Sequence, residues 1–290
     1  MSTARYRRSY ADDPTLADRI FELLETWFTG IAAPRREAAR LGSRWDDCST
    51  PFVCEKAGRL VSHVGLLEMS YVIEGERHQL GGVHGVCTLE SERRQGHFRR
   101  SMEELLEFCD GRFETLELGT EHPEYYEDFG FRVVPEHRFI ANVASAGGDG
   151  GFRPFTATEP GERELLDRLL TERAPVSQRV GVVDERDVFK FSQGTAGLHY
   201  SEALDCLAVF ELAGSRLTLS DVAACELPSL DALLSQLAPA IDTVEFHFSP
   251  DRFEVDARPE PFRFDGDYYM VRGPFAAEGQ AFMLPPPARH

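Results

Sequence analysis

The sequence predicts a mixed α/β (α+β) protein of two units in tandem, each with a mixed β-sheet and helices on both faces. Three observations lead to this fold class. At 290 residues the chain is long for one domain and comfortable for two. Its composition changes abruptly at the glycine-rich segment Ala144–Gly151, which is typical of a linker. The order of strand and helix patterns before that linker is loosely repeated after it, so we expect units at residues 1–145 and 152–290.

The first unit is expected to begin with a helix and two β-hairpins. Asp13 and Pro14 suit an N-cap and a first helical residue, and one apolar stripe follows them, made of Leu16, Ile20, Leu23, Leu24, Trp27 and Phe28. Predicted strands at Phe52–Glu55 and Leu60–Tyr71 flank a hairpin turn. A second turn at Glu74–Glu76 then leads to a third strand.

The segment Val83–Phe108 is the most informative part of the chain. A β-branched strand runs into a turn that holds Arg93, Arg94 and Gly96. An amphipathic helix follows, whose apolar residues have helical spacing: Phe98, Met102, Leu105, Leu106 and Cys109. The first N–H groups of a helix have no helical partner, and the helix dipole adds about half a positive charge there. The pattern predicts a phosphate or pyrophosphate site, and its plainer alternative is an arginine-rich surface turn.

Two motifs in the first unit resemble the GCN5-related N-acetyltransferase (GNAT) family. Arg93–Phe98 (RRQGHF) is similar to the acetyl-CoA signature R/Q-x-x-G-x-G/A, with Phe98 in place of the usual small last residue. Downstream, a strand at Thr115–Leu118 and a short helix at Pro123–Phe129 precede Tyr126–Phe131 (YEDFGF), which is similar to the family's Y-x-x-x-G-F element. The resemblance covers about Arg5 to Asn142, and it implies acetyl-CoA as cosubstrate with no metal.

The resemblance also implies roles for single residues. Tyr126 would protonate the departing thiolate. Backbone groups of the strand, the turn and the helix start would hold the cofactor, at Val86, Cys87, Thr88, Arg93, Arg94, Gln95, Gly96, His97, Phe98 and Arg99, with Thr120 on the next strand. The general base stays open among Glu117, Glu121 and His84. Each of these three also has a plainer explanation, as a solvated carboxylate or a hydrogen-bonded histidine.

The second unit is expected to repeat this order without the phosphate site. Its predicted strands are Phe152–Thr156, Leu207–Leu212, Leu217–Val222, Thr243–Phe248 and Tyr268–Val271, and its predicted helices are Glu162–Arg173 and Leu230–Leu237. Between the third of these strands and the second helix, Ala223–Pro228 (AACELP) has neither arginine nor glycine. We therefore expect a degenerate GNAT-like domain.

This tandem order resembles the Eis-type acetyltransferases without their sterol-carrier-like third domain. In that family the end of the chain enters the active site, which makes the His290 carboxylate a further candidate base. The plainer alternative for Phe282–His290 is a strap or a disordered end. A homo-oligomer is left open.

Composition narrows the function classes. A net charge of −18 argues against nucleic-acid binding, because phosphate contacts need a basic face. The acidity could attract a cationic amine, or it could serve only solubility. No apolar run approaches the ~20 residues that cross a bilayer, and the charged amino end lacks a signal-peptide core, so a cytoplasmic enzyme is expected. Six cysteines without a C-x-x-C pair predict neither zinc nor disulfides, and Cys87 is the one to check for reactivity.

The principal expectation is an acetyl-CoA-dependent N-acetyltransferase, in which the primary amine of a small molecule or peptide attacks the thioester directly. Segments Ile31–Cys48 and Glu74–Gly82 are expected to border the acceptor pocket. Two alternatives remain. One is a non-catalytic acyl-CoA-binding or regulatory module, and the other is an acyl or aminoacyl transferase built on the same tandem fold.

Overall fold

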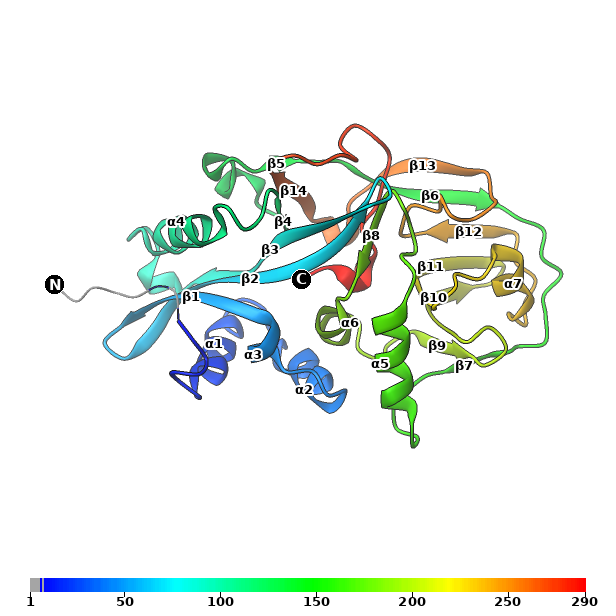
Figure 1. Cartoon of the computed structure of the whole chain (residues 1–290), viewed down its shortest axis with the longest axis horizontal. Helices are drawn as coiled ribbons and strands as arrows, with labels where there is room; N and C mark the ends of the chain where they lie inside the picture. The colour runs from blue at the N-terminus through cyan, green and yellow to red at the C-terminus, as the bar shows by residue number, and fades with distance from the viewer. Residues whose placement is uncertain (1–5, 7) are drawn as a thin grey trace.

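The computed structural model describes residue 6 and residues 8–290, and it contains two mixed sheets with helices around them (Figure 1). Arg5, where the family resemblance was expected to begin, lies outside the described residues. The first half of the chain holds α1 (Leu16–Leu24), α2 (Ala32–Arg40), α3 (Trp45–Cys48), β1 (Ser49–Lys56), β2 (Arg59–Ile73), β3 (Glu76–Thr88), α4 (His97–Cys109), β4 (Leu116–Thr120), β5 (Arg132–Val133) and β6 (Glu136–Asn142).

The second half holds β7 (Phe152–Pro154), α5 (Glu162–Glu172), β8 (Val180–Val183), α6 (Arg186–Ser192), β9 (Leu198–Ser201), β10 (Cys206–Ala213), β11 (Arg216–Ala223), α7 (Leu230–Ser235), β12 (Thr243–Phe246), β13 (Ala257–Phe262) and β14 (Tyr268–Arg272). A short 3₁₀ turn, η5 (Pro286–Ala288), follows near the end of the chain. The two mixed sheets and their flanking helices confirm the predicted fold class.

The first sheet has the strand order β1-β2-β3-β4-β14-β5, and β8 pairs with β2 at one end. Its neighbours are antiparallel except β3 and β4, which are parallel. Alternate side chains face opposite ways, so Phe52 packs under α4 while Val53 packs against α1. The sheet thus has helices on both faces.

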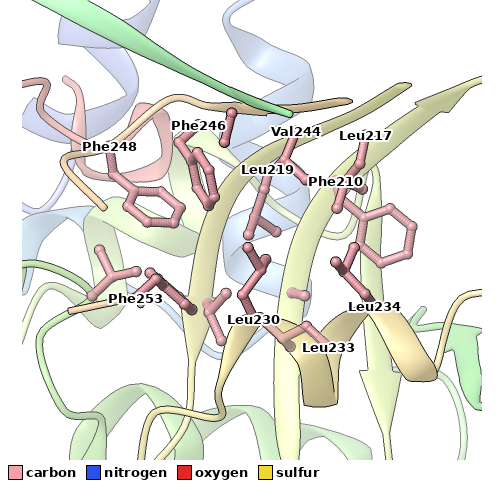
Figure 2. Packing of buried hydrophobic residues seen from close by; sticks show 14 of the residues in the cluster. Phe210, Leu217, Leu219, Leu230, Leu233, Leu234, Val244, Phe246, Phe248 and Phe253 are labelled. Atoms are coloured by element: carbon pink, nitrogen blue, oxygen red, sulfur yellow. The ribbon is translucent and has the colours of Figure 1, made fainter. Parts of the chain in front are cut away.

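The second sheet has the order β13-β6-β12-β11-β10-β9-β7, with β11 and β12 parallel. Figure 2 shows its largest core, where Phe246 and Phe248 pack near Leu219 and the leucines of α7. All the side chains named here are buried. This apolar filling holds α7 against the sheet.

The two sheets exchange strands across the linker. The predicted boundary lies between β6 and β7, yet β6 belongs to the second sheet, where it pairs with β12 and β13. In return, β14 lies between β4 and β5 of the first sheet. Met270 of β14 packs with the α4 side, while Tyr269 and Val271 pack on the opposite face. The two units therefore share strands rather than follow one another as separate bodies.

Several elements differ from their predicted form. Helix α1 ends at Leu24, so Trp27 and Phe28 lie beyond it and are each 43% exposed. The predicted short helix at 123–129 consists of two 3₁₀ turns, η2 (Pro123–Tyr125) and η3 (Glu127–Phe129), and Gly130 ends the second with φ +83° as expected. Helix α2 was not predicted, because Ala38 is its one buried residue and it has no apolar stripe.

Candidate active site

The turn before α4 leaves the start of that helix open. Arg93, Arg94, Gln95 and Gly96 are all exposed, and Gly96 is the N-cap residue with φ +81°. No side chain caps the helix, and a Cβ added to Gly96 would have no atom within 4 Å. The first N–H groups of α4 therefore remain available to an anion, as the sequence predicts.

The positive side chains around this turn are only partly engaged. Arg99 forms an ion pair with Asp128 at 2.8 Å, and the Arg93 guanidinium lies 3.9 Å from the centre of the Trp27 ring. Arg94 makes no ion pair with any described residue. His97 Nδ1 lies 3.3 Å from Cys54 Sγ, so its ring is tied to β1 rather than free in the turn. Arg94 is thus the arginine most ready for a new partner.

Strands β3 and β4 run side by side for two residue pairs and then diverge. They pair only at Gly81 with Leu116 and at Gly82 with Glu117, although both strands continue well beyond. A β-bulge at Gly85, which has φ +57°, re-aims the rest of β3. The later backbone groups of β3, including those of Val86–Thr88, consequently have no strand partner on the β4 side. An extended ligand could pair with this free edge.

Cys87 is not a reactive thiol in this arrangement. Its side chain is buried among the apolar residues under α1, and burial raises its pKa to about 12. A thiol with such a pKa stays protonated at neutral pH and is a poor nucleophile. Cys87 is left with the predicted backbone role, and all six cysteines are free.

Tyr126 and Thr120 meet near the end of β4. Tyr126 is 6% exposed, and the Thr120 side chain is close enough to its hydroxyl to lower the pKa of the phenol against the larger effect of burial. Phe98, which replaces a small residue of the signature, packs edge-on against the Tyr126 ring at 5.7 Å. Burial is the main cause that raises the pKa of Tyr126 above its usual value, so the phenol keeps its proton at neutral pH. Two predicted site residues are thereby brought together.

A second polar group lies on the opposite face of the sheet, where β3 and β4 part. Glu117 is 1% exposed, accepts a hydrogen bond from the Tyr71 hydroxyl at 3.1 Å, and lies 3.2 Å from Nε2 of His290. A Cβ on Gly82 would be 2.4 Å from that nitrogen, so only glycine leaves room for the ring. The His84 ring lies 6.2 Å from the His290 ring. Glu117, His84 and His290 are thus brought together.

The electrostatics of this polar group follow from its burial. Desolvation raises the pKa of Glu117, and the nearby His290 partly offsets this. Desolvation lowers the pKa of His84 well below its usual value, with smaller contributions from His63 and His290. His84 is therefore neutral at neutral pH, and its Nε2 is 2.9 Å from the Ser49 hydroxyl. Trp45 packs edge-on against His84 at 5.0 Å, which places the predicted acceptor segment 31–48 beside the group.

The end of the chain is an ordered strap and not a loose tail. Glu136 Oε1 accepts hydrogen bonds from Leu284 N at 2.9 Å and from Arg289 Nη2 at 2.5 Å. His137 N donates to Phe282 O at 2.8 Å, and Phe282 and Leu284 are buried in the core. Figure 1 shows the end of the chain between the two sheets, beside β2. This strap delivers the His290 side chain to Glu117.

Glu121 is the predicted site residue that lies apart. It is exposed after β4 and lies near Asp267. Burial raises the pKa of Asp267, and the charge of Glu121 adds to this effect. Sequence reasoning missed Tyr71, Tyr269, Glu136 and Arg289. Tyr71 could have been found from the sequence, because it is a polar-tipped residue at the end of a predicted apolar strand. Glu136 and Arg289 are 153 residues apart, and no sequence pattern connects them.

Within the described residues no three His, Cys, Asp or Glu side chains are grouped as metal ligands would be. Among the helices of the described residues, none has the length and apolar character needed to span a membrane.

A family model matches the part of the chain that holds this site. Residues 11–134 match the family model described as an acetyltransferase (GNAT) domain. A search of curated proteins found no match. The matched segment contains both motifs that resemble the GNAT family.

Solved structures share the fold over most of the chain. A conserved Enterococcus faecalis protein named "Probable N-Acyltransferase" has 14% identity and a TM-score of 0.61, over 92% of this chain and 71% of that chain. Eis1 from Mycobacterium abscessus has 14% identity and a TM-score of 0.56, over 92% and 72%. A GCN5-related N-acetyltransferase from Kribbella flavida has 17% identity and a TM-score of 0.52, over 89% and 68%. The likeness covers about nine tenths of the chain and so extends through both sheets, and the chain shares the fold of these proteins.

Proposed function

We propose that this protein transfers an acetyl group from acetyl-CoA to a primary amine by direct attack. One observation carries the proposal: the uncapped start of α4 adjoins the unpaired edge of β3. Together they offer a diphosphate site followed by a free strand edge of backbone groups. Such a combination suits a long molecule with a phosphate at one end and an amide-containing arm.

Each part of the ligand has a matching part of the chain. The N–H groups of residues 95–99 and the Arg94 guanidinium would hold the diphosphate. Backbone groups of Val86–Thr88 would hold the arm and polarise the carbonyl. Acetyl-CoA supplies the activated acyl group on a thioester. The amine would approach from the side of Trp45 and His84.

Tyr126 completes the reaction as proton donor. The amine nitrogen bonds to the carbonyl carbon, the C–S bond breaks, and the sulfur takes the phenolic proton of Tyr126. Because burial raises the pKa of this phenol, Tyr126 is still protonated when the thiolate leaves. The surplus proton of the amine goes to a base.

The test compares Tyr126→Phe with Tyr125→Phe, since Tyr125 is adjacent and exposed. We expect Tyr126→Phe to lower kcat about 100-fold or more, as loss of a general acid does, with the Kd of acetyl-CoA unchanged. Tyr125→Phe should match the wild type. A Tyr126→Phe variant with full kcat at every pH would remove Tyr126 from this role. Saturable CoA binding without transfer to any amine of a broad panel would favour the non-catalytic CoA-binding module instead.

A further inference from the structure

The His290 imidazole stands out in the polar group behind the β3–β4 divergence. The His290 side chain is 3% exposed, yet neither ring nitrogen makes an aligned hydrogen bond to a described residue. Its Nε2 is within ion-pair distance of Glu117, while Nδ1 has no partner at all among those residues. Buried polar atoms are normally satisfied, so an unsatisfied imidazole calls for a functional reason.

The surroundings of His290 are built to receive an imidazole. Gly82 forms a notch that any Cβ would fill, at 2.4 Å from Nε2 and 2.6 Å from Cε1. The strap anchored on Glu136 holds the ring in that notch. The notch lies at the last paired position of β3 and β4, so the ring sits at the apex of the divergence.

His63 and His84, the neighbouring histidines of this face, each have one ring nitrogen engaged. His63 Nδ1 bonds to Gly85 O at 2.7 Å, and His84 Nε2 bonds to the Ser49 hydroxyl. Burial lowers the pKa of His63 to about 4 and that of His84 well below its usual value, so both are weak bases. His290 differs from them because the buried carboxylate of Glu117 lies within ion-pair distance of its ring.

We infer that the imidazole of His290, oriented by Glu117, takes the proton that the attacking amine must lose. The inference rests on the proposed function and deepens it. As the N–C bond forms and the C–S bond breaks, the amine proton moves to a ring nitrogen of His290, directly or through one water. Tyr126 supplies the other proton, to sulfur, so charge and atoms balance. Glu117 acts as a positioning residue.

Titratable groups surround His290 on every packed element. Glu117 on β4, His84 on β3, Tyr71 on β2 and Tyr269 on β14 belong to this face, and Arg289 and Glu136 are close enough to affect Glu117. The pH profile alone would therefore mix several ionisations. Comparing kcat/KM for acceptor amines of different basicity isolates the proton-transfer step better than the pH profile does.

The experiment measures transfer by wild type and His290→Gln with two acceptors at neutral pH. One acceptor is a strongly basic alkylamine, which is protonated there. The other is methoxyamine, a weakly basic nucleophile that is almost entirely neutral at that pH. We expect kcat/KM to fall about 100-fold for the alkylamine and only a few-fold for methoxyamine, since general-base catalysis contributes about that much. The loss for the alkylamine should shrink as pH rises, because the amine then deprotonates itself.

Two further variants keep the inference testable if His290→Gln folds poorly. Gly82→Ala places a methyl group against the ring and should reproduce the acceptor-dependent loss. Glu117→Gln removes the orienting charge and should give a smaller loss with the same dependence on acceptor. The Kd of acetyl-CoA should stay at the wild-type value in all three variants.

The outcomes separate the two claims. If wild type acetylates neither acceptor nor any other amine, the proposed function fails. If wild type is active and His290→Gln matches it, the inference is overturned while the function stands. Equal losses for both acceptors would show a purely structural role for His290 and would also overturn the inference.

Discussion

The two halves of the molecule each contain a parallel strand pair connected by a helix, but only the first pair leaves an opening. In the second half, all four residues of β12 pair with β11. In the first half, two of the five residues of β4 pair with β3. Phe246 and Phe248 fill the space beside the second pair (Figure 2), whereas β3 bends away at Gly85.

The helix starts differ in the same sense. Helix α7 is capped by Ser229, whose hydroxyl accepts a hydrogen bond from Ala232 N at 3.2 Å. Helix α4 begins at Gly96 with no capping side chain. An N–H group at the start of α7 thus has an internal partner, whereas the start of α4 has no capping side chain, which is what the proposed anion site requires.

The largest effect should come from filling the opening at α4. Gly96→Val adds a β-branched side chain at φ +81°, where ligand and backbone would meet. We expect the Kd of acetyl-CoA, measured by calorimetry, to rise about 50-fold or more because the turn must rearrange and the approach is blocked.

Gly161 provides a matched control for that change. It is the N-cap of α5 with φ +84°, and it too has no atom within 4 Å of an added Cβ. Gly161→Val should cost similar stability and leave the Kd unchanged. Equal Kd values for the two variants would refute a special role for the α4 start.

A smaller effect is expected from Arg94→Ala. Arg94 makes no ion pair with the described residues, so its loss leaves little internal structure unsupported. We expect the Kd of acetyl-CoA to rise about 10-fold at low salt, and the difference to shrink at high salt, because the contact is an exposed charge pair. Arg163→Ala, in the first turn of α5, is the control and should leave the Kd unaltered. An Arg94→Ala effect that is independent of salt would argue against a phosphate contact.

The smallest effect concerns the capped helix. Ser229→Ala removes the hydrogen bond to Ala232 N and should cost about 1 kcal/mol of unfolding free energy. For a chain of this size that is about 2 °C in Tm, measured by calorimetry. Acetyl-CoA affinity should not change. If opening this cap instead created CoA binding in the second half, the contrast between the two halves would depend on capping alone.

The local parts of this picture could be predicted from the sequence. The strand, turn and helix around Gly96 follow from neighbouring residues, as does the glycine that ends the turn after Tyr126. The sequence predicts a strand at Tyr268–Val271, and β14 covers it. Its apolar side chains suit either sheet, and only tertiary packing selects a place between β4 and β5.

The buried polar group could not be predicted as a unit. The alternation Leu116-Glu117-Leu118 suggests a solvated carboxylate on an open face, and that face is covered by the strap that ends at His290. Glu117 and His290 are far apart in sequence, and no local pattern records their meeting. Glu121 has the same residue type a short distance away, and it lies exposed because the chain leaves β4 there.

The central claim is that the α4 start and not the α7 start binds the coenzyme diphosphate. An amide-resolved NMR titration with CoA tests this in one measurement, because it reports on both helix starts of the same molecule. The account predicts large shift changes at the amides of Gln95–Arg99 and Val86–Thr88, with none at those of residues 230–233. Unchanged amides at Gln95–Arg99 when CoA is saturating, or larger changes at α7, would contradict it.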